Sequence, residues 1–402
     1  MKVSPLREIG KKIYQKIPTS LRWVFWPIRL AFRLMDISKL DLWILNGEEI
    51  TSHQELSIAY AGTKVNRNYL IKLAYDNSFN EKYLGRVWLW KIFNVVREKS
   101  PNCSLMVIGV DKLLWRWFRK RTYFNVPFEV SSSADISIDT SLLWRSKDVK
   151  NAIRKVRNNK LSFEITRDFS HFDDFYYRMY RPYAIAAYGG RAIICPYDDI
   201  KKEFENGELL LIKKENQYIA GALFVYKKMQ ARALFVGVKD GNFDYVKQGA
   251  VASIHYFRTL YLKEKGCKKI DLGLSRPFLK DGVLHYKKKW GGRQIFCPPR
   301  VDGAYYVEPL TKTPGLKAFL INNPFIFIDK GKINGAIFVN SDDSVSRELL
   351  ERIYNHYYFD GMFKLFIYQF RGNSHRTQRM LPLEFSNRIK LCSAESIFQK
   401  HH

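Results

Sequence analysis

The side chains best suited to chemistry gather in two stretches in the second half of the chain. The first, K-E-K-G-C-K-K-I-D-L-G-L-S (263–275), places Asp271 in a short apolar run that stops at Gly273. The second, D-G-V-L-H-Y-K-K-K-W-G-G (281–292), carries three titratable residues in succession, His285, Tyr286 and Lys287. Groups of these types can take up or release a proton and can stabilise negative charge that develops during a reaction.

Each of these residues also has a structural interpretation. Lys287 belongs to the run Lys287–Lys289, which could be the solvated face of a basic helix. Tyr286 and His285 could pack in a core or at its edge, because both side chains have an apolar body. Asp271 could cap a turn or pair with a lysine instead of acting as a base. The residue types alone leave these alternatives open.

Neither the cysteines nor the histidines indicate a metal site. The five cysteines stand singly, with no C-x-x-C pair: Cys103, Cys195, Cys267, Cys297 and Cys392. The eight histidines show no H-E-x-x-H spacing. An odd number of dispersed cysteines is also untypical of a disulfide framework, so we expect reduced thiols and no metal.

Hydrophobic periodicity predicts the elements that position the candidate residues. The predicted helices are 147–158, capped by Ser146, a helix capped by Ser170, and helices over 249–265 and 281–290. The predicted strands are Leu161–Thr166, Glu208–Lys213, Tyr218–Tyr226, Ala231–Val238 and Lys269–Leu272. Because the helix over 249–265 joins the last two strands, these strands should be parallel neighbours that diverge at one end.

The outer parts of the chain are less regular. A strand should begin near Glu55, a buried helix should cover 83–98, and Leu105–Val110 should form a buried strand. The polar run Ser131–Ser133 is a plausible hinge between two halves. Near the C-terminus, the strands Lys332–Asn340 and Lys364–Phe370 flank a helix over 345–357, which predicts a small βαβ-like unit.

Three stretches of the sequence, in this order, resemble the Fem-related branch of the GNAT acyltransferases. The stretch R-S-K-D-V-K-N-A-I-R-K-V-R-N-N-K-L-S-F-E-I (145–165) resembles the basic helix and following strand of that branch. The stretch I-A-G-A-L-F-V-Y (219–226) is similar to its central strand. The two stretches described first resemble its strand ending in Asp-x-Gly followed by Lys-x-x-aromatic-Gly. The matching positions are Asp271, Gly273, Lys287, Trp290 and Gly291.

The resemblance implies an α/β fold (α+β layered) with tandem GNAT-like halves and mixed central sheets. Residues 46–144 would form a degenerate GNAT-like half, and 145–305 the GNAT acyltransferase domain. A basic amphipathic segment (1–45) would precede them, and a small C-terminal α/β unit (306–402) would follow. The branch includes peptidoglycan-bridge aminoacyltransferases and polysaccharide-linked acetyltransferases.

The resemblance also implies where substrates bind and which residues act. Two strands of a GNAT sheet splay apart, and the freed backbone groups can hold the acyl arm of a donor. Lys287 would neutralise an oxyanion or a substrate phosphate, Tyr286 or His285 would pass a proton to the leaving group, and Asp271 would act as base. The implied substrate- and donor-binding residues are Arg154, Arg157, Lys247, Gly249, Gly273, Ser275 and Trp290. We expect the catalytic group to face a cleft between the halves, and Lys287→Ala to lower turnover while the melting temperature barely moves.

One departure from the family pattern concerns the donor. Enzymes that use acetyl-CoA place a Q/R-x-x-G-x-G/A loop before the helix that follows the fourth strand, where bare amides bind pyrophosphate. Aligned on Gly249, the chain has Val246 and Val251 at the two other positions, so the pattern fails at both. The failed pattern counts against coenzyme A, so acyl-CoA stays a possible donor substrate while an aminoacyl-tRNA or another donor is open.

The net charge of +28 favours an anionic partner, which could be nucleic acid, an anionic bilayer or a phosphorylated substrate. Part of this charge lies in residues 1–35, which contain eight Lys or Arg residues and one Glu. Arg22, Arg29 and Arg33 fall on one face of a helical projection and interrupt an apolar, tryptophan-rich stretch, which makes it a poor membrane span but a candidate interfacial segment. The alternative is an arm that packs on its own domain.

Three functions follow from these observations. The first is an acyltransferase for N- or O-acylation of a cell-envelope or polysaccharide precursor, with a phosphorylated or glycan acceptor. The second is a Fem-type transferase that uses charged tRNA. The third is an inactive GNAT-like scaffold that binds anionic lipid or glycan. For the first function we expect a cytoplasmic protein, peripheral at the inner face of the plasma membrane.

Overall fold

The computed structural model describes residues 33–114, 124–189, 192, 194–298, 301, 303–340, 346–370, 385 and 387–398. The chain forms two compact units, each assembled from two segments. Unit 1 comprises Met1–Tyr123 with Asp302–Leu316, and unit 2 comprises Phe124–Val301 with Lys317–His402. The predicted boundary between residues 144 and 145 does not coincide with this division. Most of the predicted N-terminal segment, residues 1–32, lies outside the described residues.

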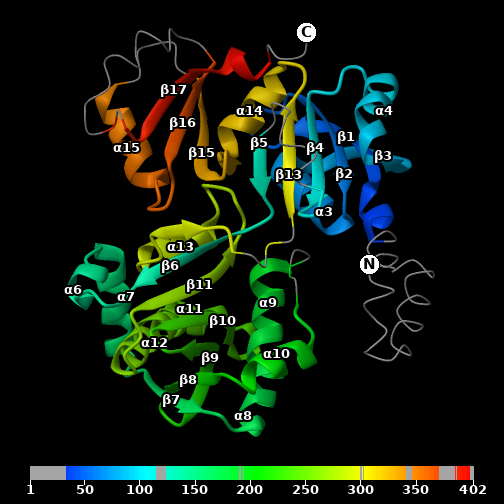
Figure 1. The fold of residues 1–402 in the computed structure, drawn as a ribbon. Helices are drawn as coiled ribbons and strands as arrows, with labels where there is room; N and C mark the ends of the chain where they lie inside the picture. Colours follow the sequence, from blue (N-terminus) through cyan, green and yellow to red (C-terminus); the bar gives the residue numbers. More distant parts are fainter. Residues whose placement is uncertain are drawn as a thin grey trace, which may run out of the picture. The chain divides into compact units, whose positions relative to one another are not determined.

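Unit 1 is built on a mixed sheet in which its strands follow the order β3-β1-β2-β4-β13 (Figure 1). Its elements are β1 (Lys39–Glu49), β2 (Glu55–Gly62), α3 (Lys64–Ala74), β3 (Tyr75–Trp88), η2 (Leu89–Lys91), α4 (Ile92–Lys99), β4 (Leu105–Asp111) and β13 (Gly303–Pro309). β2 and β4 run parallel, and the other neighbours run antiparallel. Ile92 and Val96 of α4 pack against Leu42 and Ile44 of β1 in the core of this unit.

The predicted helix over 83–98 is wrong in its first half. Residues up to Trp88 belong to β3, which pairs antiparallel with β1, and the helix α4 begins only at Ile92. Apolar and aromatic residues lie on both sides of Lys91, so periodicity alone does not separate the strand from the helix. The predicted strand over 105–110 is confirmed as β4.

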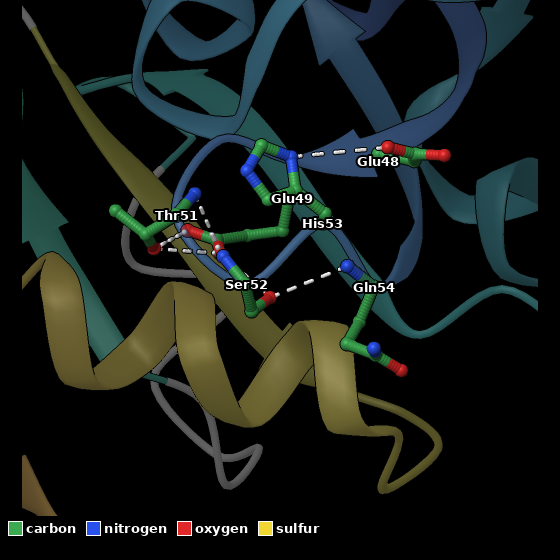
Figure 2. Close-up of polar contacts among 6 residues, drawn as sticks. All are labelled: Glu48, Glu49, Thr51, Ser52, His53 and Gln54. Atoms are coloured by element: carbon green, nitrogen blue, oxygen red, sulfur yellow. Dashed lines mark hydrogen bonds and ion pairs between the residues drawn. The ribbon is translucent and has the colours of Figure 1, made fainter.

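A buried carboxylate organises the turn between β1 and β2 (Figure 2). Glu49 is fully enclosed and accepts hydrogen bonds from the backbone amides of Thr51 (3.1 Å) and Ser52 (2.8 Å). The hydroxyls of Thr51 and Ser52 donate to the same carboxylate, at 2.7 and 2.8 Å to Oε2. Burial alone would raise the pKa of Glu49, but these hydrogen bonds outweigh it, so the pKa is lowered.

Unit 2 contains a seven-stranded mixed sheet in the order β12-β6-β11-β10-β9-β8-β7. Its strands are β6 (Val130–Asp135), β7 (Ser162–Thr166), β8 (Glu208–Lys214), β9 (Gln217–Lys227), β10 (Gln230–Val238), β11 (Lys269–Ser275) and β12 (Gln294–Phe296). All neighbours are antiparallel except β10 and β11, which run parallel as predicted. The predicted α/β class with mixed sheets in both halves is therefore confirmed.

Helices cover both faces of this sheet. They are α6 (Thr140–Leu143), α7 (Lys147–Asn158), α8 (Phe169–Asp174), the π-helix η3 (Phe175–Tyr180), α9 (Arg181–Tyr188), α10 (Tyr197–Phe204), α11 (Phe243–Gln248), α12 (Ala250–Glu264) and α13 (Gly282–Lys289). Side chains of α7 and α12 pack with Leu210 and Ile212 of β8, whereas those of α8, η3 and α10 pack with Leu209 and Leu211. Alternate residues of one strand thus point to opposite layers, as strand geometry requires.

Two expectations for unit 2 are wrong. The run Ser131–Ser133 is not a hinge but the buried centre of β6, which pairs with both β11 and β12. The helix predicted to follow Ser170 is capped by Asp168 instead, whose side chain accepts from the amide of Ser170. In contrast, Ser146 caps α7 as predicted, and Val149, Ile153 and Val156 are its buried face.

The C-terminal region forms a third sheet, β14-β15-β16-β17, within unit 2 (Figure 1, orange to red). Its elements are β14 (Phe325–Asp329), β15 (Lys332–Val339), α15 (Arg347–Tyr357), β16 (Lys364–Gln369) and β17 (Ile389–Ser393). β15 and β16 are parallel and joined by α15, so the predicted βαβ-like unit is confirmed. Leu350 and Ile353 of α15 pack on Leu365 and Ile367 of β16. The remaining elements are β5 (Phe124–Pro127), η5 (Lys239–Gly241), α14 (Pro314–Asn322) and η6 (Ala394–Ile397).

Candidate functional site

The parallel pair β10–β11 separates soon after it begins. Backbone pairing covers only residues 230–232 of β10 and 269–271 of β11, although both strands continue, to Val238 and Ser275. The pairing of β11 with β6 is also irregular between Asp271 and Leu274. The backbone of β11 is therefore released from both neighbours at the same place, around Gly273, and its polar groups need other partners.

Side chains supply these partners. Lys287 Nζ donates to Gly273 O (3.0 Å), Leu274 O (2.7 Å) and Ser275 Oγ (3.0 Å). Gly273 N donates to Asp271 Oδ1 at 2.9 Å, and the single hydroxyl proton of Ser131 has two acceptors within reach, Gly273 O (3.0 Å) and the Asp271 carboxylate. The irregular end of β11 is thus held by one lysine, one carboxylate and one serine. We call Lys287, Asp271, Gly273, Ser275 and Ser131 the β11 cluster.

Gly273 has the backbone freedom that this arrangement needs. Its φ of +81° lies in the left-handed region, which side chains with a Cβ adopt rarely. A Cβ at this position would also stand 3.3 Å from Ala233 O of β10. The glycine therefore lets β11 turn away from β10 without closing the space between the two strands.

Lys287 is the buried cation of the β11 cluster. Its side chain is 9 % exposed, and burial lowers its pKa to about 8, with the nearby cation Arg258 acting in the same direction. The carboxylates of Asp281 and Asp271 oppose this shift. An ammonium has three protons, and all three are engaged by β11. Lys287 can therefore act on a substrate through its charge, or through a proton that first leaves one of these acceptors.

Tyr286 faces the opposite way, toward α12. Its ring meets His255 edge-on at 5.2 Å, and burial raises its pKa, so the phenol stays protonated at neutral pH. Trp290 is 4 % exposed and stacks on the same His255 ring at 5.4 Å. The structure therefore places the predicted binding residue Trp290 in the core between α12 and α13, and Tyr286 beside it.

His285 is not brought together with the β11 cluster. Its Nε2 lies 2.5 Å from Leu279 O, and its ring stacks on His356 of α15 at 4.5 Å. Burial lowers the pKa of His285, so the ring is neutral at pH 7. These contacts give His285 a packing role between α13 and the C-terminal sheet. Packing was the alternative to proton transfer that the sequence left open for this residue.

The predicted basic donor site is distributed over exposed helix faces. Lys247 lies on α11 and pairs with Asp244 at 3.0 Å, and Arg154 and Arg157 lie exposed on α7. Gly249, with φ +107°, separates α11 from α12, and a Cβ there would meet Val156 of α7 at 3.6 Å. The segment before α12 is thus a short helix, α11, that ends at a left-handed glycine. A groove that these residues share with Lys287 stays a prediction.

Three residues near the site were not predicted from the sequence as site residues: Ser131, His255 and Arg258. Ser131 lay in a polar run that is typical of linkers, and only its burial reveals its role. His255 and Arg258 lie on α12, where Arg258 is four residues after the buried Ile254 and four before the buried Leu262. An arginine on the same helix face as two core residues was the signal that could have found it.

No family model matches the chain, and no curated protein matches it. Among solved structures, the chain is similar to FemX (12% identity, 66% of this chain and 83% of that chain, TM-score 0.35). It is similar to L-PGS from Bacillus licheniformis (8% identity, 70% and 85%, TM-score 0.34). It is also similar to a GCN5-related N-acetyltransferase from Kribbella flavida (9% identity, 82% and 79%, TM-score 0.26).

Proposed function

We propose that the chain is a transferase that moves an acyl or aminoacyl group to an amine or a hydroxyl at the β11 cluster. The observation that supports this proposal most directly is the separation of β10 and β11 beside a buried lysine. The separation offers backbone groups of β10 to an extended acyl arm. The lysine supplies positive charge in a place from which water is largely excluded, where electrostatic stabilisation is strongest.

The reaction has a simple balance. The nucleophilic nitrogen or oxygen of the acceptor bonds to the carbonyl carbon of the donor, and the bond from that carbon to the donor's sulfur or oxygen breaks. The proton lost by the nucleophile is gained by the leaving group. The charge of Lys287 stabilises the oxyanion of the tetrahedral intermediate, while Asp271, which already accepts from Ser131 and Gly273, keeps β11 in shape. Asp271 is in this proposal a positioning residue instead of a base.

For the donor, an aminoacyl-tRNA is the better supported choice. The chain has valine at two positions of the pyrophosphate-binding pattern, and the segment before α12 is occupied by the helix α11. The net charge of +28 also suits a polyanionic donor. Acyl-CoA is the second candidate, because α12 still presents its N-terminal amides after Gly249.

For the acceptor, we propose an amine or hydroxyl on a cell-envelope precursor, phosphorylated or carrying a glycan. The basic segment 1–35 would bring the enzyme to the inner face of the plasma membrane, where such precursors are assembled. Among the described residues no helix is both long and apolar enough to cross a bilayer.

The test is a donor comparison with matched variants. The full chain is incubated with radiolabelled acetyl-CoA or a mixture of radiolabelled aminoacyl-tRNAs, together with a lipid and glycan extract, and label transfer is measured. We expect transfer from aminoacyl-tRNA, a decrease of at least a hundredfold in Lys287→Met, and little change in Lys289→Met, whose lysine only pairs with Asp148 at the surface. No transfer from either donor, or an active Lys287→Met, would reject the proposal.

A further inference from the structure

A second buried cation lies next to the β11 cluster. Arg258 of α12 is 1 % exposed and is the largest fully buried side chain among the described residues. Its Nη2 lies 3.3 Å from Nδ1 of His255, one turn earlier on the same helix. Its Nε is buried without any hydrogen-bond partner. Of the five N–H donors of the guanidinium, one thus approaches His255 and the Nε–H has no partner.

In the described part of the chain, the charge of Arg258 is not balanced by a carboxylate. Within the described part of the chain, no aspartate or glutamate forms an ion pair with it, and the one group that favours its charged form is the phenol of Tyr286. Burial lowers the pKa of Arg258 to about 10, so the guanidinium remains charged at neutral pH. His255 does not offset the charge either: burial and the two neighbouring cations, Arg258 and Lys287, hold its pKa well below the usual range, so it is neutral.

Two buried cations from adjacent helices therefore lie within electrostatic reach of each other. The charge of Arg258 lowers the pKa of Lys287, so each side chain makes the other less stable in its charged form. A buried charge without a counter-charge is among the costliest features that a core can contain. Proteins keep such features at sites where a ligand supplies the missing charge.

We propose that Arg258 binds an oxyanion of the ligand, a carboxylate or a phosphoryl group, in a buried subsite between α12 and α13. The free Nε–H and the remaining Nη protons can donate in parallel to two oxygens of one such group, which is the geometry that arginine provides and lysine does not. Lys287 contributes its charge only, because β11 engages its three protons. The guanidinium is enclosed, so an anion reaches it only when side chains between the two helices move.

A buried anion site and a purely structural arginine predict opposite effects on stability. If Arg258 were structural, its loss would destabilise the fold. If Arg258 is instead an anion-binding residue, its replacement by an apolar residue of similar length removes an uncompensated charge. The free energy of unfolding should then stay the same or increase. Arg258→Met is therefore the informative variant, and Arg258→Lys retains the charge but not the parallel donors.

The experiment measures thermal unfolding of the full chain in chloride, in acetate and in inorganic pyrophosphate, at constant ionic strength. The control is Arg352→Met, because Arg352 is exposed on α15. We expect one anion to raise the melting temperature of the wild type and of Arg352→Met, with the response lost in Arg258→Met and reduced in Arg258→Lys. A response to acetate identifies a carboxylate ligand, and a response to pyrophosphate a phosphoryl ligand.

Either of two results would overturn the proposal: an unchanged anion response in Arg258→Met, or no response of the wild type to either anion. A clear drop in the melting temperature of Arg258→Met in chloride would count against it as well. The proposed subsite depends on the proposed transferase function in one respect only: the anion would be part of the donor or the acceptor. Label transfer without an Arg258-dependent anion response would reject the subsite alone, and the reverse result would reject the transferase alone.

Discussion

At the scale of single residues, Lys287 combines a structural and a chemical task. Its ammonium replaces ladder hydrogen bonds that β11 loses around Gly273, and its burial gives it an unusually low pKa. Truncation to alanine would leave buried carbonyl oxygens without donors, at a cost of about 1–3 kcal/mol. We therefore revise the expectation from sequence: Lys287→Ala should lower the melting temperature as well as turnover.

The pKa of Lys287 predicts a pH dependence. Because the folded-state pKa is about 8, below the ordinary value of 10.5, the ammonium loses its proton as pH rises through about 8. If its charge stabilises the oxyanion, kcat should fall on the alkaline side with a midpoint near pH 8. In Lys287→Arg the charge persists, so any activity that remains should lack this limb. A wild-type kcat that stays level from pH 7 to 9.5 would contradict the electrostatic role.

The same shift has a consequence for stability. Between about pH 8 and 10.5 the unfolded chain binds more protons at this lysine than the folded chain does, so unfolding becomes less favourable as pH rises. The difference in free energy of unfolding between the wild type and Lys287→Met should change in that window. This measurement, by urea titration, needs no substrate.

Glu49 predicts a pH dependence of the same sign, but in the acidic range. Its pKa is lowered in the fold, so its hydrogen bonds to Thr51 and Ser52 stabilise the protein above the ordinary pKa of 4.5, and this stabilisation is lost as pH falls through the folded-state value. Glu49→Gln should cost about 1–3 kcal/mol at pH 7 and less at lower pH. Glu48→Gln is the control, because Glu48 is exposed and only approaches His53. Equal losses in both variants at pH 7 would contradict the buried role of Glu49.

The candidate site was predictable from sequence only in part. Lys287, Asp271, Gly273 and Ser275 lie together because the motif that carries them is local: a strand end and a helix a few residues later. Ser131 reaches the same cluster from 140 residues away in the chain, and no local pattern encodes such a contact. Arg258 was missed because periodicity ranks residues by apolarity and so overlooks a cation on the buried face.

At the scale of elements, prediction succeeded where caps and periodicity agreed. The helix α7 has a serine cap, a clear apolar stripe and exposed basic residues, and the strands β8 to β10 are short apolar runs between polar turns. It failed where one apolar run serves two elements, as at the junction of β3 and α4. β6 was mistaken for a linker because its buried centre is made of serines, of which Ser131 and Ser133 hydrogen-bond across the sheet.

The helix α13 presents two adjacent lysines with different tasks, which makes a matched test. Lys288 Nζ donates to the carbonyls of Asn355 (3.1 Å), His356 (3.0 Å) and Tyr358 (2.8 Å) and so caps the C-terminal end of α15. Lys289 forms only an exposed pair with Asp148. Lys288→Met should lower the free energy of unfolding by about 2–3 kcal/mol, because charge-assisted hydrogen bonds are lost, whereas Lys289→Met should change it by less than about 1 kcal/mol.

The readout for this pair is chemical denaturation with hydrogen exchange. In Lys288→Met the amides of α15 should exchange faster than those of α7, because the cap is lost on α15 alone. If both lysine variants unfold at the same denaturant concentration, Lys288 does not anchor the C-terminal sheet to α13.

At the scale of the whole molecule, net charge and the order of elements determine different properties. The net charge of +28 predicts which partners the surface attracts but carries no information about fold. The architecture follows from the order of strands and helices. For the chain after residue 145, that order could largely be predicted from the sequence. The C-terminal βαβ-like unit was predicted from sequence, but the elements that it packs on were not. Within unit 2, Lys288 and the bridge between Phe278 and Phe325 connect it to the segment around α13.

The last prediction concerns attachment to membranes. Residues 11–35 contain Arg22, Arg29 and Arg33 together with Trp23 and Trp26, a composition typical of segments that lie in the headgroup region. Lys and Arg near an anionic surface contribute about 1 kcal/mol each, so three or four engaged side chains would give binding in roughly the millimolar range before any apolar insertion. This attraction must weaken with salt, because the Debye length falls from about 10 Å at 0.1 M to about 3 Å at 1 M. We therefore expect the full chain to float with vesicles in proportion to their anionic-lipid content, and a chain that starts at Asp36 to remain at the bottom of the gradient. Equal flotation of the two chains, or equal binding to neutral and anionic vesicles, would show that this segment is not the anchor.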